Sequence, residues 1–139
     1  MRGAAILTAL VLLALPMGAC AAGPREVPVL AGPWASYQEG YGHVEPPTIY
    51  NGGDILGRVR DIEWLTWSGP RAVGVGLSTW VGPHQVTAEG TLQTADVVLF
   101  NLGYCHGRRA YDAVEWYFPE HGQHFRPHTY IDAYTGQYR

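Results

Sequence analysis

The chain has 139 residues, and its twelve acidic and nine basic side chains give a formal net charge of −3. Charged residues make up only 15% of it, against roughly 25% in an average soluble domain, and all the basic residues are arginines. A mildly acidic chain without a basic cluster argues against nucleic acid as a partner and against electrostatic docking on anionic lipid.

Residues 1–19 have the pattern of a signal peptide. Arg2 supplies a positive start, residues 4–15 are an apolar run, and Pro16 ends that run before Met17-Gly18-Ala19-Cys20. The run is shorter than the stretch of about 20 residues that a spanning helix needs. The sequence therefore predicts an exported protein whose mature part is one small domain.

Two processing routes remain open at Cys20. Small residues followed by Cys resemble a bacterial lipobox, in which Cys20 is lipidated and holds the protein on the outer face of the cytoplasmic membrane. Cleavage at the Ala-x-Ala site Ala19-Cys20-Ala21 removes Cys20 instead and gives a secreted protein. We favour lipidation, because Cys directly after small residues at the end of a signal is uncommon by chance. On either route Cys105 is left as a free thiol, for which burial is the commonest role.

The predicted elements after the signal are short strands. Residues 20–47 are rich in Pro and Gly and are expected to form a tether and a loop, followed by one β-rich domain at 48–139. Strands are expected at 58–67, 75–80, 95–100 (closed by 101–103) and 109–118, with a possible short strand at 85–90 and a last strand or helical turn at 130–134. Gly and Pro turns between such strands predict an all-β fold, a small antiparallel β-sandwich or barrel-like domain.

Two glycines distinguish the second expected strand. Gly74 and Gly76 alternate with branched apolar residues, so one face of this strand is bare backbone. Glycine inside a strand marks a bend or the close approach of a bulky group. We expect Trp64 or Trp67 from the preceding strand to cover the bare face.

Several motifs carry a resemblance. They are Ile62-x-Trp64-x-x-Trp67, Ala72-x-Gly74-x-Gly76, Gly90-Thr91, the apolar residues 97–99, and Cys105-His106-Gly107 before Tyr111. Over residues 54–118 the chain resembles a group of uncharacterised exported, lipoprotein-like proteins of mycobacteria and related actinomycetes. The resemblance implies a compartment and a fold but no activity. Relatives often carry a cysteine pair within the stretch that is 79–89 here, so the resemblance also implies that Cys105 is left over from a lost disulfide.

One candidate chemistry is metal binding by the C-terminal loop. His121, His124 and His128 lie close together in sequence, and imidazoles suit zinc or copper, with His106 or Cys105 as a further ligand. Gly122 and Pro127 exclude the helix that would align these histidines, and the spacing matches no strict ligand pattern. The alternative is a polar surface loop.

Two further candidates concern the first long strand. Asp61 and Glu63 lie two residues apart, a spacing compatible with a small hydrolase acting on glycosides, although the wet face of a strand explains them as well. Trp64, Trp67 and Trp80 are candidates for a face that stacks on envelope sugars, and core packing is the alternative. No catalytic set stands out, so the sequence favours a binding or structural module of the cell envelope over an enzyme.

Overall fold

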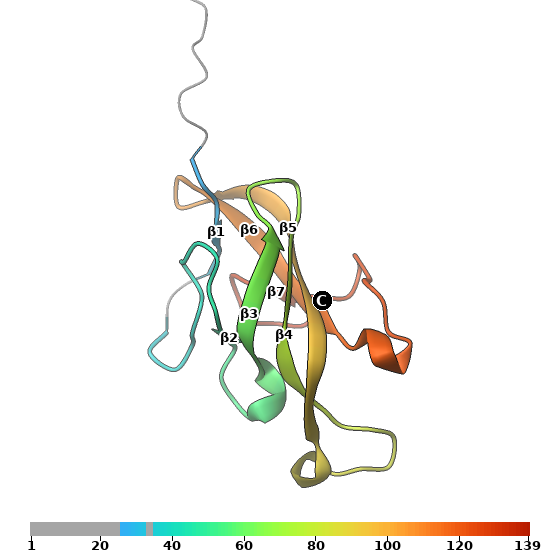
Figure 1. Ribbon diagram of the computed structural model, residues 1–139. Helices are drawn as coiled ribbons and strands as arrows, with labels where there is room; N and C mark the ends of the chain where they lie inside the picture. Colours follow the sequence, from blue (N-terminus) through green and yellow to red (C-terminus); the bar gives the residue numbers. More distant parts are fainter. Residues whose placement is uncertain (1–25, 33–34) are drawn as a thin grey trace, which may run out of the picture.

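The chain forms one mixed β-sheet that curls into a half-barrel (Figure 1). The computed structural model describes residues 26–32 and 35–139. Its strands are β1 Val29–Leu30, β2 Ile49–Tyr50, β3 Arg58–Thr66, β4 Ala72–Trp80, β5 Thr91–Cys105, β6 Arg108–Tyr117 and β7 Ile131–Asp132, with short 3-10 turns η1 Ile55–Gly57, η2 Thr87–Glu89 and η3 Pro119–His121. The sheet order is β1-β6-β5-β4-β3-β2, and β7 also pairs with β6. The prediction of an all-β, barrel-like fold is confirmed. The pairing is antiparallel throughout these strands except between β1 and β6, which run parallel.

The four main expected strands are present as β3 to β6, with differences at their ends. Residues 85–90 contain η2 (Thr87–Glu89) rather than a short strand, because the Glu89 carboxylate accepts the Val86 N–H and closes a tight turn. β5 continues through residues 101–103 to Cys105. Asn101 takes a left-handed conformation (φ 52°), which Asn tolerates better than most residues. This residue shifts the alternation of side chains between the two faces of β5 without ending the strand.

The bare face of β4 is its core face. A Cβ atom on Gly74 would lie 2.9 Å from Trp64 Cε3, so Trp64 covers this glycine as expected. A Cβ atom on Gly76 would lie 2.8 Å from the Arg60 carbonyl oxygen. β3 therefore approaches β4 more closely than any side chain larger than hydrogen allows at these positions.

The inside of the curl holds the main core, to which all seven of these strands contribute. Its largest fully buried side chains include Leu30, Tyr41, Ile49, Val59, Val97, Leu99, Tyr111 and Val114. Full burial of one such aliphatic side chain contributes about 1.5–3 kcal/mol. This core is the main source of the stability of the fold.

The segment expected to be tether and loop forms part of the folded unit. β1 pairs with β6, and Leu30 and Ala31 are buried. The Leu30 N–H donates to the His43 carbonyl, and Glu39 forms a bridge with Tyr50 of β2. Residues 39–43 thus connect the two edges of the curled sheet by backbone hydrogen bonds. The domain as described begins before residue 48.

A second, smaller cluster covers the outer face of the sheet. Val98, Phe100 and Ala113 are buried there under Phe125 and Tyr130 of the C-terminal segment. The Phe100 ring meets the Phe125 ring edge-on, with centroids 5.0 Å apart. The chain after β6 therefore folds back over the sheet and closes its outer side.

Candidate functional site

Trp64 and Trp67 pack against the main core. The Trp64 indole N–H donates to the Pro46 carbonyl at 2.9 Å, and the Trp67 indole N–H donates to the Pro28 carbonyl at 3.0 Å. Their rings meet edge-on, with centroids 4.7 Å apart. Both side chains are only partly buried, but they serve to hold the N-terminal segment on the sheet.

Trp80 lies apart from these two, beside η3. Its ring is stacked on the His121 ring, with centroids 3.9 Å apart and planes inclined by 7°. Phe118 meets the Trp80 ring edge-on, with centroids 5.1 Å apart, and His121 Nε2 contacts the Gln93 side-chain oxygen. The three predicted ligand-facing tryptophans are therefore not brought together on one face.

The three loop histidines do not form a metal centre. Within residues 26–32 and 35–139, no group of three or more His, Cys, Asp or Glu side chains could hold a metal ion. His121 is committed to Trp80, whereas His124 lies near Glu115. Gly122 has φ 72° and turns the chain after η3, which separates the histidines.

Asp61 and Glu63 are both exposed, with the buried Ile62 between them. Asp61 has φ 52° and lies at a bulge that interrupts the pairing between β3 and β4. It forms an ion pair with the neighbouring Arg60 at 3.6 Å. The bulge removes the regular strand spacing on which the prediction of a hydrolase pair depended.

The predictions about processing and thiols fall outside the described residues. These are the signal peptide at 1–19, the lipidation of Cys20 and the state of the Cys105 side chain, and they stay predictions. In the part of the chain that is described, no helix is long and apolar enough to cross a membrane.

A broad, open depression of about 1120 Å³ lies where the β3–β4 turn meets the bent part of β5. Residues 68–71 of the turn and residues 100–102 of β5 form two of its walls. The remaining lining residues are Glu26, Tyr104, Arg109 and Pro127. The conformation of Asn101 matters here, because Phe100 packs on the outer cluster whereas Leu102 packs on the main core. The depression therefore opens at a bend between the two faces.

Arginines distinguish this depression from the rest of the described surface. Residues 26–32 and 35–139 contain seven arginines. Five of them form ion pairs with carboxylates, namely Arg58, Arg60, Arg108, Arg126 and Arg139. Arg71 and Arg109 have no carboxylate partner within the same residues, and both line the depression. Glu26 is the one acidic residue among the lining residues, and Arg108 lies 3.7 Å from its carboxylate. The depression thus carries an excess of positive charge in an acidic chain.

Hydrogen bonds and ring contacts fix the walls that carry these arginines. The Tyr111 hydroxyl donates to the Gly69 carbonyl at 2.8 Å, which anchors the β3–β4 turn to the core. The Arg71 guanidinium lies over the Phe125 ring, 4.5 Å from its centroid. Arg109 Nη1 donates to the Glu26 carbonyl at 3.4 Å. Both guanidinium groups are positioned by neutral partners, which leaves their charge uncompensated.

Glu115 holds the loop that carries Phe125. Its carboxylate is buried on the outer face, accepts the Arg126 N–H at 2.9 Å and lies 3.7 Å from Arg126 Nε. Burial raises the pKa of Glu115, and the contacts with Arg126 and the nearby His124 oppose that rise. The carboxylate thereby connects the outer face of β6 to the rim of the depression.

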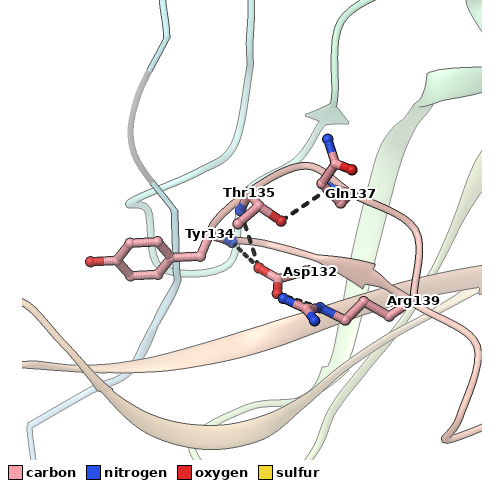
Figure 2. A network of polar contacts seen from close by, with 5 residues as sticks. All are labelled: Asp132, Tyr134, Thr135, Gln137 and Arg139. Carbon is pink, nitrogen blue, oxygen red and sulfur yellow. Dashed lines mark hydrogen bonds and ion pairs between the residues drawn. The ribbon is translucent and has the colours of Figure 1, made fainter.

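A polar network fixes the C-terminal segment over the sheet (Figure 2). The Asp132 carboxylate accepts the N–H groups of Tyr134 and Thr135 and lies 2.9 Å from Arg139 Nε. Burial tends to raise the pKa of Asp132, but the hydrogen bonds from Arg139, Thr135 and Tyr134 outweigh it and lower the pKa. The end of the chain is thus tied to β7 and β6.

No protein family model, curated protein or solved structure matches this chain. The site is therefore defined by its own residues. It is an arginine-lined depression at one end of a β half-barrel. Sequence analysis missed Arg71 and Arg109. Arg71 stands beside Pro70 in a turn and Arg109 follows Arg108 at the start of β6, so only the fold brings them to one place.

Proposed function

We propose that this protein is a non-enzymatic binding module of the cell envelope that holds an anionic group of its ligand between Arg71 and Arg109. The observation that carries the proposal is that the two arginines without a carboxylate partner in residues 26–32 and 35–139 line the same depression. A guanidinium group offers several N–H donors in one plane and binds carboxylate or phosphate by paired hydrogen bonds.

The other lining residues favour an organic ligand over a bare ion. Leu102 and Tyr104 place apolar and aromatic surface in the same depression as the arginines. Small-molecule sites commonly combine an apolar lining with a few polar groups that fix orientation. The envelope location is inferred from the signal-like residues 1–19.

The test is a titration of the protein with inorganic phosphate, in which binding is monitored through the amide chemical shifts in NMR spectra. We expect saturable shifts at Gly69, Arg71 and residues 101–104. The affinity of the double variant Arg71→Gln, Arg109→Gln for phosphate should be lower by about tenfold or more, because both charge-assisted contacts are removed. Its spectrum should otherwise show the same fold, since Arg71 is exposed and Arg109 is half-buried.

Arg60→Gln is the matched control. Arg60 is exposed like Arg71, but it already has Asp61 as a partner and lies away from the depression. This variant should bind phosphate as the parent does. Equal phosphate binding by the double variant and the parent, or shifts spread evenly over the surface, would overturn the proposal.

A further inference from the structure

The arginine-lined depression lies at the end where the chain enters the domain. Glu26, the first described residue, is one of its lining residues. Figure 1 shows the chain entering β1 at the end that also carries the β3–β4 turn and the β5–β6 hairpin. Cys20 precedes Glu26 by six residues, and each residue spans at most about 3.6 Å of chain. A lipid on Cys20 therefore keeps the depression within about 20 Å of the membrane surface, whatever path the chain takes.

Two exposed side chains at this end suit a membrane interface. Tyr104 in the β5–β6 hairpin is 76% exposed, and Val27 beside the depression is 47% exposed. Tyrosine is enriched at the boundary between water and lipid, where its ring and its hydroxyl find suitable surroundings. An aromatic ring, an aliphatic side chain and the arginines of the depression thus share one end of the molecule.

Charge also distinguishes the two ends. Arg71 and Arg109 line the depression with a single carboxylate, that of Glu26, and Arg108 lies 3.7 Å from this carboxylate. Asp54 caps η1 and Glu89 ends η2, two turns that Figure 1 places at the far end, and Arg58, which follows η1, is paired with Glu39. An anionic surface attracts the arginine end and repels the other, so it would orient the domain as well as bind it.

We infer that the anionic group taken by the depression is the phosphate of an anionic phospholipid headgroup, so that this end of the domain rests on the membrane. The inference rests on the proposed function and names its ligand. Arg71 and Arg109 contact the phosphate oxygens, while Leu102 and Tyr104 lie against the glycerol and the first methylenes. The same residues would also bind a free phosphate ester, and the experiment separates these two sources.

The experiment measures binding to vesicles without help from the anchor. The full chain with Cys20→Ala keeps an Ala-x-Ala cleavage site and cannot be acylated, and the exported product is purified. It is sedimented with vesicles of phosphatidylcholine alone and with equimolar phosphatidylcholine and phosphatidylglycerol. We expect binding only to the second, reduced about tenfold or more by Arg71→Gln with Arg109→Gln and unchanged by Arg60→Gln. Glycerol phosphate at high concentration should compete.

Three outcomes would overturn the inference, and they separate it from the proposed function. No vesicle binding, with phosphate still shifting the signals of the depression, would leave a site for a soluble anion and remove the lipid. No response to either probe would remove the proposed function as well. Equal vesicle binding by the parent and the double variant would place the membrane contact on another surface.

Discussion

The two faces of the sheet differ in what holds them together. The inner face is closed by apolar side chains from all seven described strands, and the polar groups of Trp64, Trp67 and Tyr111 that reach it have backbone partners. The outer face has three buried apolar residues under a C-terminal segment, and the buried carboxylate of Glu115 takes part in holding this segment in place. The inner face therefore supplies the stability of the fold, whereas the outer face supports the rim of the depression.

This difference teaches where substitutions should act on stability and where they should act on binding. Residues of the inner face that do not contact the walls of the depression should change the free energy of unfolding without changing the site. Residues of the outer face should affect both, because Phe125 belongs to the small cluster and also lies under Arg71.

The largest effect is expected from Gly76→Ala on the inner face. The added Cβ would lie 2.8 Å from the Arg60 carbonyl oxygen and 3.0 Å from the side chains of Val59 and Ile62, so β3 must move. We expect the free energy of unfolding to fall by about 1–3 kcal/mol, measured by urea unfolding followed by tryptophan fluorescence.

Gly103→Ala is the control for this substitution. Gly103 also lies within a strand, but its added Cβ has only Asp112 Oδ2 near it, at 3.7 Å. This variant should be as stable as the parent or slightly more so, because alanine restricts the unfolded chain. Equal losses in the two variants would show that packing against β3 is not the cause.

The strands were predictable because their signals are local. The branched residues at 97–100 and the alternation in 109–118 indicate strands without reference to the rest of the chain, and β5 and β6 lie there. Residues 20–47 were interpreted as tether and loop because they are rich in glycine and in prolines, which lack a backbone N–H. Their carbonyls still accept, and those of Pro28 and Pro46 receive the two indole N–H groups from β3 and the residue that follows it.

The site was not predictable, because it depends on contacts between distant segments. Arg71 and Arg109 come to line one depression only through the pairing of β4, β5 and β6 and the bend at Asn101. The expected absence of a basic cluster is true of the sequence, but ion pairs elsewhere on the described surface leave these two arginines uncompensated at one place. The histidines of the C-terminal loop are not grouped as metal ligands in the described residues for a related reason, since His121, although close to the others in sequence, is stacked on Trp80.

An intermediate effect is expected from Phe125 on the outer face. Phe125→Ala removes the ring that covers Phe100 and supports Arg71, and we expect a loss of about 1–2 kcal/mol, because Phe125 is only partly buried. Phe125→Leu should recover most of this stability but not the position of Arg71, since it restores apolar contact without a ring. Both variants should therefore bind phosphate more weakly than the parent. Parent-like phosphate binding in Phe125→Leu would show that the ring does not position the guanidinium.

The smallest effect is expected from the pH dependence of stability at Glu115. Burial raises the pKa of this carboxyl in the folded protein, so between its unfolded and folded pKa values the folded state binds more protons than the unfolded state. The contribution of Glu115 to stability must then decrease as the pH rises through that interval. Glu115→Gln cannot titrate but keeps an acceptor for the Arg126 N–H. Comparing urea unfolding of the two proteins from about pH 4 to pH 7, we expect the parent to lose stability relative to the variant. The opposite slope would mean that Arg126 and His124, the charged groups facing this carboxylate, outweigh its burial. The outer face would then be held by charge pairing and not, as we infer, by the packing of Phe125 and Tyr130 on the sheet.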